Sequence, residues 1–165
     1  MKETLRSQLD QILSAYDAKR VEAEKETHRL KEEEEAFIHR FREIRDALLR
    51  PSLHEFGETL RHRGHEYWVS EEDESVGRDG RARSARIILT IHPAHTDPKP
   101  RRGPSSSPAI AFAASRRRRK VNVYVRIPPY NDGSAEPRAE FTLEQLNAAV
   151  VEAELVKALK EILGT

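Results

Sequence analysis

The first fifty residues carry apolar side chains at alternating gaps of four and three residues, with no glycine or proline among them. Side chains at this spacing lie along one face of an α-helix and form the seam that a partner helix covers. Proline disfavours helical geometry in the residue before it, so Pro51 predicts that the helix ends near Leu49. We therefore predict one uninterrupted helix over residues 2–49, about 70 Å long at a rise of about 1.5 Å per residue.

A helix of this length cannot bury its seam on the rest of the chain, which has about 115 residues and suffices for one modest core. We expect residues 1–50 to form a parallel homodimeric coiled coil, an oligomerisation stalk whose middle pairs loosely because Lys19 and Glu26 occupy seam positions. The alternative is a helical hairpin folded back near residues 24–35, although no Gly, Pro or Asn favours a turn there. The residues expected to contact a second copy are Leu9, Ile12, Tyr16, Leu30, Phe37, Phe41, Ile44 and Leu48.

Residues 51–165 predict a small α+β domain. Ser52 followed by Glu55 matches a capping box, which predicts a short helix over residues 52–63 that Gly64 ends. After this helix the apolar period changes to two, which is typical of strands with one buried and one exposed face. We expect four strands, at about residues 66–70, 84–92, 109–115 and 120–127.

The connections between these strands are short and rich in Gly, Pro and Ser, which predicts an antiparallel meander without crossover helices. Thr142 with Gln145 repeats the capping signature and predicts a final helix over residues 142–163, whose apolar stripe covers the sheet. The expected fold is thus a two-layer α+β arrangement of helix, four strands and helix. In element order alone it is similar to RWD-type domains, the small globular heads of some coiled-coil assemblies, and a fold does not fix a function.

Positive charge is concentrated in two places, although the net charge of the whole chain is only +1. Arginine forks pair well with phosphate, so both clusters are possible polyanion-binding sites. In an antiparallel meander, however, the acidic run 71–74 lies at the same end of the sheet as residues 116–119. We therefore favour charge compensation within the chain, with a nucleic acid or an acidic protein partner as alternatives. The clusters are the loop 99–102 with Lys99, Arg101 and Arg102, and the run Arg116, Arg117, Arg118, Arg119 and Lys120.

Two histidine pairs share the same spacing, His62 with His65 and His92 with His95. The start of one strand neighbours the end of the next in an antiparallel pair, so the four imidazoles are weak candidates for a zinc site. A site of four histidines is less usual than a mixed one. Solvated or hydrogen-bonded histidines are therefore the favoured interpretation, and we predict no metal and no cofactor.

The remaining composition excludes several function classes. The chain has no cysteine, which removes disulfides and thiol catalysis, and it has no run of about 18 apolar residues to span a membrane. Phosphate-cradling glycine patterns and nucleophile motifs are absent, and no convergent acid/base set is evident. The start lacks the apolar stretch of a secretory signal, so a cytoplasmic location is expected.

These observations favour a non-enzymatic, homo-oligomeric scaffold or adaptor. Its stalk would set the stoichiometry, and its α+β domain would dock a protein partner that the sequence does not identify. The alternative is a nucleic-acid-associated protein that contacts phosphates through residues 116–120 and the loop 99–102. An enzyme stays open as a third class and would require a deep pocket that gathers several ionisable groups.

Overall fold

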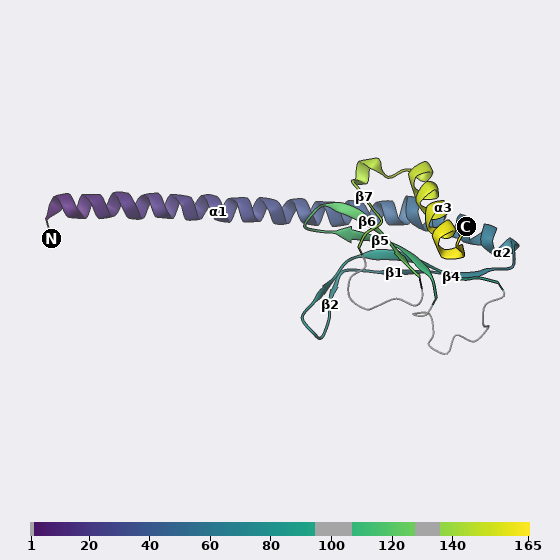
Figure 1. Cartoon of the computed structure of the whole chain (residues 1–165). Coiled ribbons are helices and arrows are strands. Elements are labelled where there is room, and N and C mark those ends of the chain that lie inside the picture. Colours follow the sequence, from purple (N-terminus) through teal and green to yellow (C-terminus); the bar gives the residue numbers. More distant parts are fainter. Residues whose placement is uncertain (1, 95–106, 128–135) are drawn as a thin grey trace. The chain divides into compact units, whose positions relative to one another are not determined.

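The computed structural model describes residues 2–94, 107–127 and 136–165 (Figure 1). Four residues of the predicted sites lie outside these ranges, namely His95, Lys99, Arg101 and Arg102. The chain divides into two compact units, Met1–Ala36 and Phe37–Thr165, which we call the helical unit and the globular unit.

The helical unit is formed by the greater part of α1, which runs without interruption from Glu3 to Ile44 (Figure 1). This continuity confirms the predicted long helix and contradicts the alternative of a hairpin near residues 24–35. Arg29 donates hydrogen bonds to Glu26 and to Glu33, at spacings of three and four residues. Exposed pairs of this kind stabilise a helix by about 0.2–0.5 kcal/mol each, so local charges contribute modestly to this helix.

Pro51 does not break the helix, contrary to our prediction. A π-helical turn, Arg45–Leu49, follows α1 directly and leads into α2, Arg50–His62. The N–H of Arg50 donates to the carbonyl of Arg45, five residues back. A proline ring clashes with the carbonyl four residues earlier and leaves it without a donor, so the wider turn accommodates Pro51 without ending the helix.

The predicted capping box at Ser52 is therefore wrong, because Ser52 lies inside α2 and no side chain caps its first residue. The predicted end of this helix at Gly64 is confirmed. Gly64 adopts a φ of +90°, and the N–H of His65 donates to the carbonyl of Leu60. Glycine reaches this left-handed conformation without strain, which explains why α2 ends here.

The globular unit contains an antiparallel five-stranded sheet in the order β1, β4, β5, β6, β7, so the predicted meander is confirmed. Sequence analysis missed β7, a short strand at the edge, and a separate hairpin of β2 and β3 inserted between β1 and β4. The strands are β1 Glu66–Glu72, β2 Ser75–Val76, β3 Ala82–Arg83, β4 Arg86–His92, β5 Ala109–Ser115, β6 Lys120–Arg126 and β7 Ala139–Phe141.

The register explains how one face of the sheet becomes the core. Leu89 pairs with Ile110, which in turn pairs with Val125, and all three point to the same face. The helices α2 and α3, Ala148–Leu163, lie on one side of the sheet (Figure 1). The largest fully buried side chains are Phe41, Phe112, Ile38, Leu49, Leu53, Ile87, Leu89, Ile91, Ile110, Leu155, Val121 and Val123.

The predicted capping signature at Thr142 and Gln145 is present, but it begins a single 3₁₀ turn, Leu143–Gln145. The chain then extends at Leu146, and Asn147 caps α3 by accepting a hydrogen bond from the N–H of Val150. The final helix thus begins six residues later than predicted, at Ala148.

Candidate functional site

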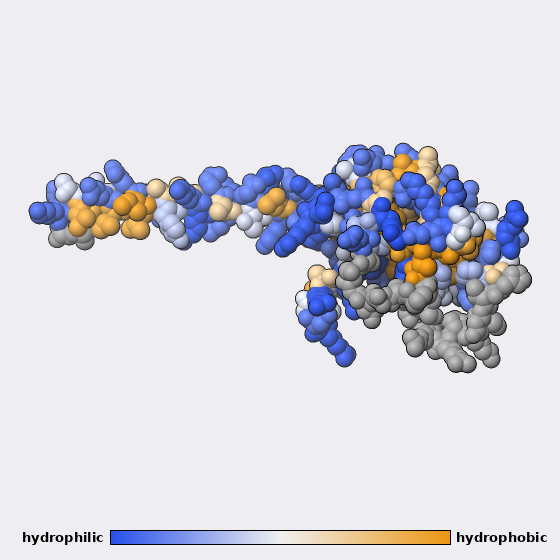
Figure 2. Space-filling view, in the orientation of Figure 1, coloured by the Kyte–Doolittle hydropathy of each residue, from blue (hydrophilic) through white to orange (hydrophobic). Residues whose placement is uncertain are grey.

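The apolar stripe of the helical unit is exposed to water. Leu9, Ile12 and Tyr16 are 40%, 63% and 63% exposed, and Leu5 and Leu30 on the same stripe are 47% and 42% exposed. Figure 2 shows apolar side chains gathered toward the amino-terminal end of α1. A row of large apolar side chains on an otherwise charged helix is typical of a surface that another helix covers.

The other predicted seam residues lie in the globular unit, where they contribute to its core. Phe37 and Phe41 are fully or almost fully buried there, and Ile44 and Leu48 pack against the same core. A second chain is not needed to bury these four side chains. The prediction that they contact another copy is untested, and any proposal of self-association depends instead on residues 5–30.

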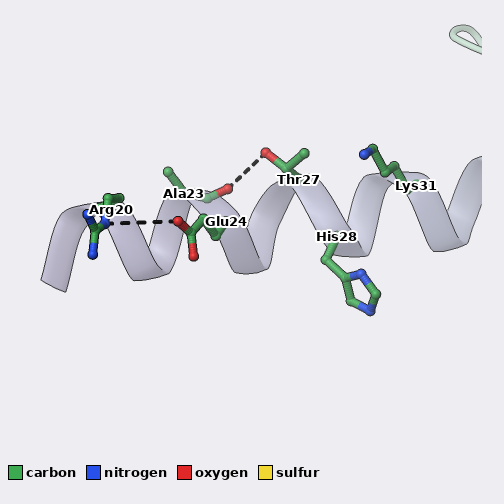
Figure 3. A pocket seen from close by; sticks show the side chains of 6 residues that line it. All are labelled: Arg20, Ala23, Glu24, Thr27, His28 and Lys31. Carbon is green, nitrogen blue, oxygen red and sulfur yellow. Dashed lines mark hydrogen bonds and ion pairs between the residues drawn. The ribbon is translucent and has the colours of Figure 1, made fainter. Parts of the chain in front are cut away.

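A shallow depression lies on the surface of α1, where the small side chains of Ala23 and Thr27 follow the apolar stripe (Figure 3). Thr27 donates a hydrogen bond to the carbonyl of Ala23, and Arg20 pairs with Glu24 at 3.9 Å. All lining residues come from one helix, and a single convex surface cannot enclose a ligand. The depression is therefore an open part of the helix surface and not an enclosed ligand site.

The basic run at the β5–β6 turn is partly neutralised by carboxylates of the same unit. Arg116 donates two hydrogen bonds to Glu74, at 3.0 and 2.5 Å. Arg118 and Lys120 both pair with Glu140 of β7, at 2.9 and 3.1 Å. The bond from Arg116 to Glu74 is a contact of the kind expected between the basic and acidic runs, whereas Glu140 lies on a strand that the sequence did not reveal.

The acidic run 71–74, which begins at the end of β1, is neutralised in part by arginines from the π turn and α2. Glu71 accepts hydrogen bonds of 2.5 and 2.7 Å from Arg50, and Asp73 accepts one of 3.0 Å from the buried Arg45. The hydrogen bonds from Arg50 hold the pKa of Glu71 below its ordinary value, although partial burial opposes the shift. The same pair raises the pKa of Arg50, so both groups stay charged.

A hollow of about 540 Å³ lies between the β2–β3 hairpin and the β5–β6 turn. Three arginines line it, and two of them, Arg83 and Arg117, have no ion pair with any described residue. Arg83 was missed by sequence analysis because it belongs to the unrecognised β2–β3 hairpin. The Asp79-Gly80 pair is a sequence signal for a hairpin turn, and Gly80 does adopt a φ of +77°. The lining residues are Glu74, Ser75, Val76, Ala82, Arg83, Ser84, Ala114, Ser115, Arg116 and Arg117.

The histidines do not assemble a metal site within the described ranges, which contain no group of three or more His, Asp or Glu able to hold an ion. The β1–β4 register brings residue 66 opposite His92, as expected for neighbouring strand ends. His65 accepts a hydrogen bond of 2.8 Å from the N–H of Ala94, and His92 lies edge-on to Trp68 with ring centroids 6.5 Å apart. Both imidazoles thus have local packing or hydrogen-bonding partners.

A further cluster of ionisable groups surrounds Tyr67, which packs closely against α2. The Tyr67 hydroxyl donates a hydrogen bond of 2.7 Å to Glu58 and lies 3.4 Å from Nδ1 of His54. The bond to Glu58 and burial both raise the pKa of Tyr67. The same bond lowers the pKa of Glu58, although burial opposes that shift. A raised pKa keeps the Tyr67 hydroxyl protonated near neutral pH, so it donates to Glu58 and joins β1 to α2.

Comparison with protein-family models, with curated proteins and with solved structures finds no match to this chain. Within the described residues, no helix combines the length and the apolar character needed to cross a membrane. Two surfaces are candidates for binding, the exposed stripe of the helical unit and the basic hollow of the globular unit.

Proposed function

We propose that this protein is a non-enzymatic, self-associating scaffold or adaptor, in which the helical unit pairs with a second copy and the globular unit docks a protein partner. The observation that carries the proposal is the exposed stripe of Leu9, Ile12 and Tyr16. Helices in proteins gain most of their stability from packing of an apolar face rather than from helix propensity. A second copy offers an identical stripe, and closed homodimers are the commonest assemblies of soluble proteins.

The pairing is proposed to be parallel, with the strongest contacts near the amino-terminal end. Leu5, Leu9, Ile12 and Tyr16 follow one another at seam spacing, whereas Lys19 next on the seam would meet its own copy. Like charges at a seam position oppose pairing. We therefore expect residues 5–16 of the seam to contribute more to association than the middle of the helix.

Light scattering on the intact chain tests this proposal. We expect a mass of twice the 18.9 kDa of one chain, and a single-chain mass for the variant Leu9→Glu/Ile12→Glu at the same concentration. The variant Gln11→Glu/Ser14→Glu adds the same charge on the opposite side of α1 and serves as the matched control. A wild-type protein of single-chain mass, or equal loss of the dimer in both variants, would contradict the proposal.

The competing function is nucleic-acid binding through residues 116–120 and the loop 99–102. It is less well supported because Arg116, Arg118 and Lys120 are paired with Glu74 or Glu140. Titration with a random DNA duplex at low and raised salt separates the two functions, since a phosphate binder loses affinity steeply with salt. The expected cytoplasmic location stays a prediction, which cell fractionation checks.

A further inference from the structure

The basic hollow of the globular unit has the chemistry of a binding site for a carboxylate-bearing ligand. Its lining includes three arginines and one acidic residue, Glu74, which holds Arg116 through two hydrogen bonds. Arg83 and Arg117 take part in no ion pair or side-chain hydrogen bond within the described ranges. Two guanidinium groups are thus available at one hollow, and each can pair with a carboxylate through two N–H donors.

The rest of the lining combines hydroxyl groups with small apolar side chains. Ser75, Ser84 and Ser115 supply hydroxyls, and Ala82 and Ala114 contribute methyl groups. Val76 also lines the hollow and is 72% exposed, an unusual position for a large apolar side chain in a hairpin of a chain this polar. An occupant with both acidic and small apolar side chains would satisfy both parts of this surface.

We propose that the hollow binds an acidic peptide segment of a protein partner, whose carboxylates pair with Arg83 and Arg117 and whose small apolar side chains contact Val76. This inference rests on the proposed function, because it assigns the docking surface of the globular unit. A nucleic acid fits less well, since no aromatic side chain lines the hollow for base stacking. Two available guanidinium groups also provide few of the phosphate contacts from which nucleic-acid affinity is built.

The test is a fluorescence anisotropy titration of the full chain with a short labelled peptide of alternating Glu and Ala. The first variant is Arg83→Gln/Arg117→Gln. The matched control is Arg81→Gln/Arg118→Gln, which removes the same charge from the same hairpin and turn but leaves the lining intact. Arg81 and Arg118 are paired with Asp79 and Glu140, so neither guanidinium is available in the same way. Circular dichroism confirms that each variant is folded.

We expect the wild-type chain to bind the peptide, the first variant to bind at least about tenfold more weakly, and the control to change by less than about threefold. Absence of binding to the wild type, or equal losses in both variants, overturns the proposal. Tighter binding of a short DNA duplex than of the peptide, weakened by Arg83→Gln/Arg117→Gln, overturns it in favour of a nucleic acid.

Light scattering on the same samples separates this inference from the scaffold proposal. A dimer that fails to bind the peptide refutes the docking site and leaves self-association standing. A single-chain protein that binds the peptide through Arg83 and Arg117 refutes self-association and leaves the docking site standing.

Discussion

The two parts of α1 carry the same apolar spacing and meet different surroundings. In the globular unit, Phe37 and Phe41 are buried in the core of the same chain, whereas Leu9 and Ile12 in the helical unit are exposed. The spacing of apolar residues along a helix therefore predicts which face is buried, but it does not predict which part of the protein or which partner covers that face. The difference lies at the carboxyl-terminal end of α1, where the large side chains of Phe37, Ile38 and Phe41 belong to the core of the globular unit.

The charges of the two units differ in a similar way. Pairs in the helical unit, such as Arg29 with Glu26, join residues three or four apart and support only the helix itself. Pairs in the globular unit, such as Arg50 with Glu71, join residues far apart in the sequence and fix α2 against β1. The same residue types thus contribute local helix stability in one unit and tertiary structure in the other.

The largest expected effect comes from truncating the buried part of the stripe. Phe41→Ala should lower the free energy of unfolding of the globular unit by about 3–5 kcal/mol, because Phe41 is fully buried and leaves a cavity. Tyr16→Ala in the exposed part should change the same free energy by less than about 0.5 kcal/mol. Urea denaturation followed by circular dichroism measures both. Similar losses in the two variants would abolish the distinction between the two parts of α1.

The elements that sequence analysis located correctly are those with a local cause. The β5 strand has the predicted bounds 109–115, and Gly64 ends α2 because glycine alone adopts its left-handed conformation without strain. The capping pair Thr142 and Gln145 was recognised from its spacing. Each of these features is decided by neighbouring residues, so the pattern is visible in a short stretch of sequence.

The features that were missed depend on contacts between distant segments. Pro51 was expected to end the helix, but packing of Leu49 and Leu53 in the core keeps the chain helical through a π turn. The three residues of β7 have no alternating pattern and pair with β6 across a long connection. Arg83 and Arg117 line the same hollow because the β2–β3 hairpin lies beside the β5–β6 turn, a tertiary arrangement that residue spacing alone does not predict.

A smaller change in stability, at Gly57 of α2, distinguishes the effect of helix propensity from the effect of packing against β1. Gly57→Ala should destabilise the globular unit by about 1–3 kcal/mol, because a Cβ at this position would lie 2.4 Å from the Tyr67 ring. Alanine is otherwise the better helix former by about 1 kcal/mol, so the sign of the change is informative. Thr27→Ala in the helical unit should instead leave the globular unit unchanged and raise the helix content. Thermal denaturation measures both, and a stabilising Gly57→Ala would show that α2 does not approach β1 this closely.

The smallest expected effect depends on pH and concerns the pair of Glu71 and Arg50. The pKa of Glu71 is lower in the folded chain than in the unfolded chain. The ion pair therefore stabilises the fold fully at a pH above the pKa that Glu71 has in the unfolded chain. This stabilisation is lost as pH falls through the pKa that Glu71 has in the folded chain. Glu71→Gln should therefore reduce the free energy of unfolding by at most about 1 kcal/mol near neutral pH. The difference from wild type should disappear in acid, below the folded pKa. Urea denaturation across this pH range measures the change.

Glu26→Gln in the helical unit is the matched control, because the pKa of Glu26 is also lowered by a hydrogen bond from an arginine, Arg29. Glu26 is exposed, and its partner lies one turn away on the same helix. We expect this variant to lower the helix content slightly near neutral pH and to leave unfolding of the globular unit unchanged at every pH. If Glu26→Gln altered that unfolding as much as Glu71→Gln does, the charges of the two units would act alike, and the contrast between local and tertiary ion pairs would not hold.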